Sequence, residues 1–262
     1  MNIVVCIKQV PETTEVSVDP ETNALVREGV DSIVNPVDEN AIEAALLLRE
    51  AHGGKVTVVT MGPPQAEEAL RHALAMGADE GILLSDPASR GSDTLATSYT
   101  LARMVRKLGE VDLVLCGRQA IDGDTGQVGP GLAERLGAPQ VTFAIELEVS
   151  DGKLRARRVL DDFFEVLEVS LPAVVTVVKQ MNEPRRPSMR NLLKAKRAEI
   201  TKWALADLDA DSTQTGFEGS PTQVIRVWPP AKRSGGRKLE GAPDEIAAEI
   251  AKVIRDMKLA SG

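Results

Sequence analysis

Cysteine and histidine are scarce in this chain of 262 residues, which has two of each. Cys6 and Cys116 each close an apolar run, so the chain has neither a disulfide framework nor a CxxC metal motif, and we expect both thiols to be reduced core residues. His52 and His72 are too few and too isolated to indicate a metal site.

Long hydrophobic runs and a net positive charge are also absent. No apolar stretch approaches the roughly 20 residues that cross a membrane, and the start, MNIVVCIKQV, has a strand pattern without the basic and apolar regions of a signal peptide. With 31 basic and 39 acidic residues the formal charge is −8, whereas general nucleic-acid binding usually leaves a basic surface. We therefore expect a soluble, cytoplasmic protein of a prokaryote-like cell, without membrane insertion and without a nucleic-acid partner.

The familiar phosphate-binding and catalytic motifs are missing as well. There is no GxxxxGK(S/T) loop, GxGxxG is absent from the first strand-to-helix turn, and neither HExxH nor a Ser/His/Asp set occurs. Covalent chemistry by the chain's own side chains is thus not expected, and any redox work would belong to a bound cofactor.

The first two thirds of the chain alternate strand and helix patterns, which predicts a mostly parallel sheet in a three-layer α/β/α fold. We expect strands at 2–8, 55–61, 80–85 and 111–117, and helices at 36–52, 65–76, 92–107 and 127–136. Strand-like runs at 141–149, 153–160 and 165–170 follow, and Ser150, Asp151 and Gly152 have the chemistry of a β-hairpin turn. The β-branched run AVVTVV after Pro172 predicts one more central strand.

Three regions are expected along the chain: an α/β domain at 1–182, a basic segment at 183–202 and a C-terminal arm at 203–262. The middle segment has seven Lys or Arg against two Glu, which indicates either a partner surface or a solvated face. The arm includes a linker at 234–241 and an amphipathic helix at 244–258, which could dock on its own domain or clasp another chain.

The stretch VDLVLCGRQAIDGDTGQVGP, residues 111–130, predicts a ligand site. In an open α/β sheet ligands collect beyond the carboxyl ends of the strands, and here an apolar strand runs into a loop of glycines, carboxylates, hydroxyls and amides. The glycines permit close backbone approach, and the helix that follows offers free N–H groups to an anion. A mobile Gly-rich connection is the alternative, but it does not need the donors and acceptors of Asp122, Asp124, Thr125 and Gln127.

The same sheet edge should gather residues from the other strand ends. These are Cys6 with Lys8, Met61, and the segment Asn35, Pro36, Val37, Asp38, for which helix capping alone is the alternative. The segment GSDTLATS, residues 91–98, places the hydroxyls of Thr94, Thr97 and Ser98 at the start of a helix. They can bind phosphate or ribose oxygens, whereas capping by Ser92 or Asp93 explains only part of the set.

Together these segments closely resemble the beta subunit of electron transfer flavoprotein. The resemblance extends from VVCIKQVP through KAKRAEI, ending at Ile200, and includes VNPVDENAIEAAL, TMGPPQAEEALRHALAMGAD, GRQAIDGDTGQVGP and NEPRRPSMRNLLKAK in the family's order. The family's signature near the end of the core is similar to ARRVLDDFFEVLEVSLPAVVT, with Phe163 where an acidic residue or glycine is usual.

The resemblance implies an adenine nucleotide alpha hydrolase-like fold and a heterodimer with an alpha subunit that carries FAD. This chain would bind a second nucleotide, either structural AMP or, in the electron-bifurcating group, a second FAD that takes a hydride from NADH. The candidate cofactor-binding residues, from the strand ends and the resemblance together, are Cys6, Lys8, Asn35, Pro36, Val37, Asp38, Met61, Asp93, Thr94, Thr97, Gly117, Arg118, Gln119, Ala120, Ile121, Asp122, Gly123, Asp124, Thr125, Gly126, Gln127 and Val128.

Two further expectations follow from the resemblance. GSDTLATS and KQVPE are similar to the bifurcating group, so FAD is favoured over AMP, with ferredoxin or flavodoxin as the low-potential acceptor and an acyl-CoA dehydrogenase served through the alpha-subunit FAD. The segment after NEPR resembles the family's dehydrogenase-recognition loop, whose apolar anchor aligns with Met189, flanked by Leu192 and Leu193. The alternative is a subunit that binds structural AMP and only docks the dehydrogenase.

Overall fold

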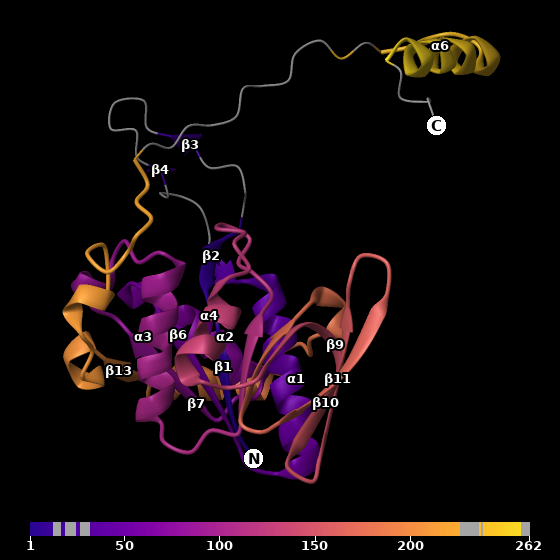
Figure 1. Cartoon of the computed structure of the whole chain (residues 1–262). Helices are drawn as coiled ribbons and strands as arrows, with labels where there is room; N and C mark the ends of the chain where they lie inside the picture. Colours follow the sequence, from indigo (N-terminus) through magenta and orange to yellow (C-terminus); the bar gives the residue numbers. More distant parts are fainter. Residues whose placement is uncertain (13–16, 19–24, 27–31, 226–235, 237, 258–262) are drawn as a thin grey trace. The chain divides into compact units, whose positions relative to one another are not determined.

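The computed structural model describes residues 1–12, 17–18, 25–26, 32–225, 236 and 238–257 (Figure 1). The chain forms two units, Met1–Val227 and Trp228–Gly262. Residues 234, 235 and 237 of the linker predicted at 234–241 lie outside the described residues.

A nine-stranded sheet forms the centre of the first unit, in the order β11-β10-β9-β12-β8-β1-β6-β7-β13. Its strands are β1 (Asn2–Cys6), β6 (Lys55–Met61), β7 (Glu80–Leu84), β8 (Leu113–Gly117), β9 (Gln140–Ser150), β10 (Lys153–Val159), β11 (Phe164–Ser170), β12 (Ala173–Val177) and β13 (Thr201–Trp203). The strands from β9 to β13 in this order pair in parallel, and β10 and β11 extend the sheet antiparallel. The predicted mostly parallel sheet is confirmed, and so is the central strand after Pro172.

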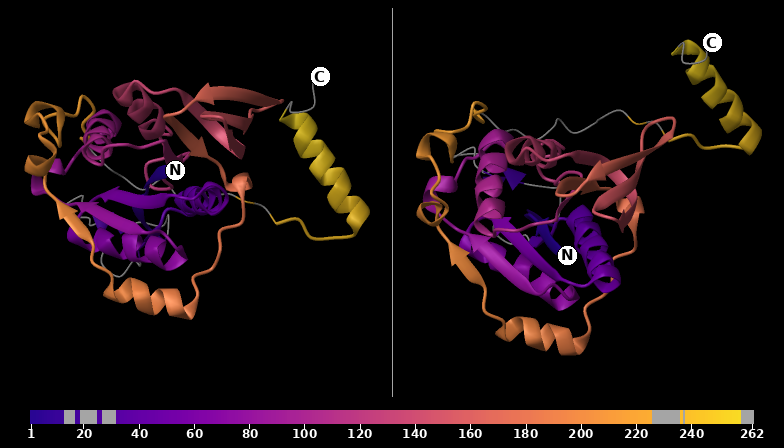
Figure 2. Two further views of the ribbon diagram at one scale, coloured as in Figure 1. Left: turned by 90° about the horizontal axis from the view of Figure 1, so that it is seen from below. Right: turned by 60° about the horizontal axis from the view of Figure 1, so that its bottom comes forward.

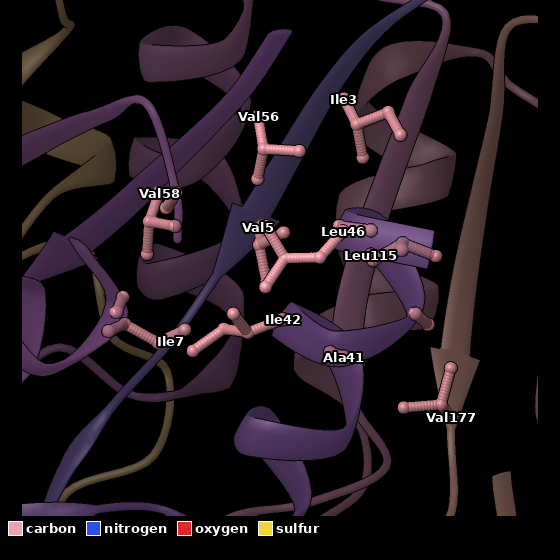
Figure 3. Packing of buried hydrophobic residues seen from close by; sticks show 14 of the residues in the cluster. Ile3, Val5, Ile7, Ala41, Ile42, Leu46, Val56, Val58, Leu115 and Val177 are labelled. Atoms are coloured by element: carbon pink, nitrogen blue, oxygen red, sulfur yellow. The ribbon is translucent and has the colours of Figure 1, made fainter. Parts of the chain in front are cut away.

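Helices cover both faces of this sheet, which confirms the predicted three layers (Figure 2). Alternate residues of a strand point to opposite faces. Ile3 and Val5 of β1 thus pack in the cluster with α1 (Pro36–His52) and α2 (Glu67–Met76), as Figure 3 shows for α1. Val4 and Cys6 pack in a second cluster with α3 (Thr94–Lys107) and α4 (Val128–Leu136).

The predicted hairpin joins β9 and β10 through Asp151 and Gly152, whose φ angles of 50° and 72° are left-handed. The predicted helix at 36–52 and strand at 55–61 are confirmed to the residue. The strand predicted at 2–8 ends at Cys6, because the Lys8 N–H donates to the Asp38 carboxylate instead of continuing a strand.

Smaller elements complete the two units. Two-stranded sheets pair β2 (Gln9–Pro11) with β5 (Ser32–Val34) and β3 (Ser17–Val18) with β4 (Leu25–Val26). Short 3-10 helices are η1 (Pro64–Ala66), η2 (Pro87–Ser89), η3 (Lys179–Met181), η4 (Leu205–Leu208) and η5 (Ser212–Gln214), and α5 (Met189–Arg197) follows η3. The second unit contains α6 (Pro243–Asp256), with Ile250, Val253 and Ile254 exposed. Within the described ranges, no helix has the length and apolar character needed to cross a membrane.

Neighbouring leucines of α1 give a matched test of the core. Leu46 is fully buried between α1 and the sheet, whereas Leu47 is 46% exposed. Leu46→Ala should lower the free energy of unfolding by about 2–5 kcal/mol, and Leu47→Ala by less than about 1 kcal/mol, because only the first leaves a cavity. Urea unfolding of the purified chain, followed by circular dichroism, measures both. Equal losses would contradict the packing described for α1.

Candidate functional site

Asn35, the residue before α1, fixes the course of the loop that follows β8. Its side chain is fully buried, and its Nδ2 donates to the Gln119 carbonyl at 2.9 Å while its Oδ1 accepts the Ile121 N–H at 3.1 Å. Its backbone N–H donates to the Lys8 carbonyl at 2.9 Å. The side chain makes no hydrogen bond that caps α1. Capping alone therefore does not describe Asn35, which joins the segments after β1 and β8.

Asp38, in the first turn of α1, binds backbone N–H groups of the same two segments. Its Oδ2 accepts the Lys8 N–H at 2.8 Å and its Oδ1 accepts the Gly117 N–H at 3.1 Å. A Cβ at Gly117 would collide with Asp38 Oδ1, so only glycine fits the end of β8. Burial raises the pKa of Asp38 to about 7, although hydrogen bonds from Asn35 and the two N–H groups oppose the rise.

The acidic residues of the loop already have partners. Lys8 Nζ lies 2.7 Å from both carboxylate oxygens of Asp122, and Gln119 Nε2 donates to Asp124. Asp124 takes a left-handed φ of 51°, and its N–H donates to the Ala120 carbonyl at 2.8 Å. These contacts reduce the repulsion that the loop would otherwise exert on an anion.

The two helices that begin beside the loop differ at their first turns. Asp93 caps α3, because its Oδ1 accepts the N–H groups of Leu95 and Ala96 at 2.9 and 3.0 Å. Burial tends to raise the pKa of Asp93, but backbone hydrogen bonds outweigh it and the pKa is lowered. In contrast, Gln127, the N-cap residue of α4, makes no capping hydrogen bond with its side chain, so the first turn of α4 can offer N–H groups to an anion.

A hydrogen bond joins the starts of α3 and α4. Thr94 Oγ1 donates to Gln127 Oε1 at 2.9 Å, and Thr97 follows on α3, half-buried. Ser98 is buried instead: its hydroxyl donates to the Leu95 carbonyl, and it lies where a Cβ on Gly131 of α4 would touch it. The expectation that Ser98 would face a ligand is therefore wrong, because the contact between α3 and α4 covers it.

The structure brings most of the predicted site residues to one sheet edge. Hydrogen bonds and ion pairs connect Lys8, Asn35 and Asp38 to the loop at 117–128, and Thr94 to its end. Cys6 is buried at the end of β1, and Met61 is half-buried at the end of β6. Pro36 is exposed and Val37 is half-buried at the start of α1.

Phe143 is a residue of the site that no sequence pattern indicates. It has a left-handed φ of 60° within β9, and its N–H donates to Thr176 Oγ1 at 3.2 Å, next to an irregularity in the pairing of β9 with β12. The Arg118 guanidinium lies 4.9 Å from the centre of the Phe143 ring, within cation–π range. Such a backbone angle in a non-glycine residue is uncommon, and here it supports a loop arginine. The run VTFAIELEV shows no glycine or other local sign of it.

The predicted anchor of the recognition segment is exposed on α5. Met189 is 73% exposed, and Leu192 and Leu193 are exposed as well. Ser188 caps the helix through a hydrogen bond from the Asn191 N–H.

Possible metal ligands and the two cysteines are among the described residues. In the part of the chain that the structure describes, no three His, Cys, Asp or Glu side chains are grouped so as to hold a metal ion. Cys6 and Cys116 are free, buried and paired in register on β1 and β8. The expectation of free core thiols is confirmed.

These features define an α/β protein with a polar, glycine-rich loop beyond the carboxyl ends of a parallel sheet. The model of the electron transfer flavoprotein domain matches residues 22–208. The chain belongs to the electron transfer flavoprotein family, among its beta subunits.

Several relatives match over nearly their whole length. The electron transfer flavoprotein subunit beta of Clostridium acetobutylicum is 47% identical over 256 residues, covering 98% of both chains. The caffeyl-CoA reductase-Etf complex subunit CarD of Acetobacterium woodii is 47% identical over 258 residues, again 98% of each. Protein FixA of Azorhizobium caulinodans is 46% identical over 265 residues, covering 96% of this chain and 94% of its own.

The raised pKa of Asp38 predicts a pH dependence of stability. Its pKa is about 7 in the folded chain against 3.8 for the unpaired group, so the folded state holds this proton more tightly. The stabilisation that Asp38 provides is full below pH 4 and is lost as the pH rises through 7, a change on the order of 4 kcal/mol. Asp38→Asn should remove this fall from the free energy of unfolding measured between pH 4 and 8.

Asp112→Asn is the control, because Asp112 also accepts a backbone N–H, that of Asn2 at 2.7 Å, but is only half-buried. It should keep the wild-type pH dependence. An unchanged slope in Asp38→Asn would contradict the assignment to Asp38.

Proposed function

We propose that this chain is the beta subunit of a heterodimeric electron transfer flavoprotein, paired with an alpha subunit that carries FAD, and that its loop at 117–128 binds a second FAD. The observation that carries the proposal is the uncapped first turn of α4, reached by a loop that Asn35 and Asp38 hold by three hydrogen bonds. A helix start of this kind suits a phosphate group.

The donor set fits an anionic nucleotide. Lys8 pairs with Asp122, Gln119 bonds Asp124, and Asp38 is buried with a pKa near neutrality, so the carboxylates around the loop are neutralised or engaged. Gly123 has free space where a Cβ would stand, and Gly126 has a left-handed φ of 63°. The backbone can therefore approach a bound group closely.

The start of α3 supports FAD over AMP. AMP ends at one phosphate, whereas FAD needs donors along a pyrophosphate and a ribityl chain. The hydrogen bond from Thr94 to Gln127 brings the hydroxyl-bearing turn of α3 next to the start of α4, which extends the donor set beyond one helix. The alternative remains a beta subunit that binds structural AMP and serves for docking.

In this proposal the chain's residues hold and orient the nucleotide. The first turn of α4 binds a phosphate, Thr94 and Thr97 bond hydroxyls or phosphate oxygens, and Arg118, held against Phe143, presents a cation to the loop. A bound FAD would supply the redox chemistry, because it can accept a hydride from NADH and release electrons one at a time. One electron would go to ferredoxin or flavodoxin, and the other through the alpha-subunit FAD to an acyl-CoA dehydrogenase.

Nucleotide content separates FAD from AMP. Acid extraction and chromatography of the purified heterodimer should give two FAD and no AMP. Asn35→Ala should leave one FAD, because the loop at 117–128 loses its two side-chain hydrogen bonds to this residue.

Asn182→Ala is the matched control, since Asn182 also exchanges hydrogen bonds with α1, through Asn40, but these bonds do not involve the loop at 117–128. It should retain two FAD. One FAD and one AMP in the wild type would refute the FAD assignment and leave the docking role.

The exposed side of α5 supports a docking role for the segment at 183–202. Met189, Leu192 and Leu193 are exposed apolar residues, and Arg190 and Lys194 are exposed beside them. Buried apolar anchors prolong a complex, and surrounding charges speed its formation, so an acidic partner surface fits. The name of CarD, which places that relative in a complex with caffeyl-CoA reductase, supports a partner that acts on CoA thioesters.

Met189→Asp should slow electron delivery from the heterodimer to an acyl-CoA dehydrogenase about tenfold or more, with the flavin content unchanged, because it puts a charge at the centre of the contact. Stopped-flow or steady-state assays with limiting dehydrogenase measure this rate. Phe163→Asp, a change at an exposed apolar residue of the β10–β11 turn, is the control and should deliver electrons normally. Delivery unaffected by Met189→Asp would refute docking through α5.

A further inference from the structure

Helix α5 is short and buries almost none of its apolar surface. It has nine residues, of which only Ala195 is buried, and its larger apolar side chains are exposed. Isolated helices of this length are marginal in water, and most helices in proteins are stabilised by packing of an apolar face. Contacts other than apolar burial must therefore hold α5 in place.

Arg71 of α2 holds the C-terminal end of α5. Its Nη1 donates to the carbonyls of Ala195, Lys196 and Ala198 at 2.7, 3.2 and 3.2 Å. The last carbonyls of a helix have no partner within the helix, and a cation there is favourable. Figure 2 shows α5 beside α2, so the guanidinium crosses directly from one helix to the other.

Glu67 fixes the position of the Arg71 guanidinium. It lies one turn before Arg71 on α2 and accepts from Arg71 Nε at 3.1 Å. Its second oxygen lies 2.8 Å from Lys202 Nζ of β13. The hydrogen bonds from Lys202 and Arg71 lower the pKa of Glu67. The carboxylate thus ties α2 to both the end of α5 and the strand after it.

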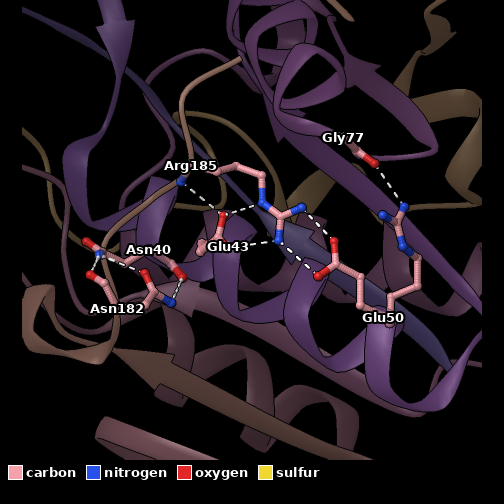
Figure 4. A network of polar contacts seen from close by, with 7 residues as sticks. Asn40, Glu43, Glu50, Gly77, Asn182 and Arg185 are labelled. Carbon is pink, nitrogen blue, oxygen red and sulfur yellow. Dashed lines mark hydrogen bonds and ion pairs between the residues drawn. The ribbon is translucent and has the colours of Figure 1, made fainter. Parts of the chain in front are cut away.

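Arg185 holds the chain on the N-terminal side of α5. Its guanidinium donates to Glu43 at 2.8 and 2.9 Å and to Glu50 at 2.6 and 3.2 Å, both on α1 (Figure 4). Glu43 is buried, and its Oε2 also accepts the backbone N–H of Arg185 at 3.1 Å, which offsets part of the cost of burying the carboxylate. Nearby, Asn182 and Asn40 exchange hydrogen bonds in both directions.

We propose that Arg71 and Arg185 are positioning residues that hold α5 by its two ends, so that Met189, Leu192 and Leu193 stay available to the partner dehydrogenase. This inference rests on the proposed docking role of α5. A helix held by apolar packing would have to bury these side chains against its own domain. Two guanidinium groups on backbone carbonyls and carboxylates fix the helix while leaving its apolar side chains exposed.

The test uses Arg71→Met and Arg71→Lys in the heterodimer. Arg71→Met keeps the apolar stem and removes all donors, and Arg71→Lys keeps the charge but lacks the planar guanidinium, whose Nε and Nη2 bond Glu67 while Nη1 bonds the carbonyls. Hydrogen–deuterium exchange of amides 191–198 should accelerate about tenfold in Arg71→Met and by a smaller factor in Arg71→Lys. The KM for a purified acyl-CoA dehydrogenase should rise about fivefold in Arg71→Met, with kcat and flavin content unchanged.

Arg103→Met is the matched control. Arg103 of α3 also donates to backbone carbonyls of a later segment, to Leu208 at 3.0 and 2.7 Å, but it does not contact α5. It should change neither the exchange of 191–198 nor the KM. Arg185→Met should raise the KM as Arg71→Met does, because it frees the other end of the segment.

The outcomes separate this inference from the docking role itself. Wild-type exchange and KM in Arg71→Met would overturn the positioning role, even where Met189→Asp still blocks delivery. Arg71→Lys gives a second check. If Arg71→Met raises the KM but Arg71→Lys keeps both the wild-type exchange and the wild-type KM, only the charge at this position matters, and the positioning role is also overturned. Normal delivery by Met189→Asp would instead refute the docking role.

Discussion

The buried hydrogen bonds of Asn35 and Asp38 are the constraint on which the site depends. Each side chain is buried, and each bonds backbone groups at or just beyond the ends of β1 and β8. A buried polar group left without a partner costs about 1–3 kcal/mol. Another path for the loop at 117–128 would leave several such groups unpaired at once. The loop is therefore held in one conformation although it contains glycines and lies largely on the surface.

Helix α1 links this constraint to the segment at 183–202. Its apolar residues, such as Ile42 and Leu46, are fully buried against the sheet. Glu43 and Glu50, seven residues apart and so on one side of a helix with 3.6 residues per turn, bind Arg185 before α5. The same helix thus places the candidate nucleotide loop at its start and the beginning of the segment at 183–202 along its side. Neither region depends on its own loop residues alone.

Sequence patterns predicted the regular elements well, because buried helices and strands need apolar residues at regular spacing. Pro36 at the start of a periodic apolar run gave α1, and a nearly continuous apolar run gave β6, both to the residue. The rule for parallel strand ends also brought Lys8, Asp38 and Gly117 together correctly. The burial of Ser98 and the left-handed backbone of Phe143 depend on Gly131 and Thr176, which are distant in the sequence. No local pattern records such contacts.

Local pairing of charges explains how a chain with a net charge of −8 can have a candidate anion site and a basic helix. Charge acts locally, because ions in solution screen exposed charges beyond about 10 Å. At the loop, Lys8 offsets Asp122. Beside α5, Glu43 and Glu67 engage Arg185 and Arg71, the two arginines that fix the segment. Arg190 and Lys194 remain exposed on the helix itself, so the arginines that bond the domain and the cations of the proposed docking surface are different residues. Substitutions of Arg71 and Arg185 should change how α5 is held, whereas substitutions of Arg190 and Lys194 should slow the formation of a complex with an acidic partner.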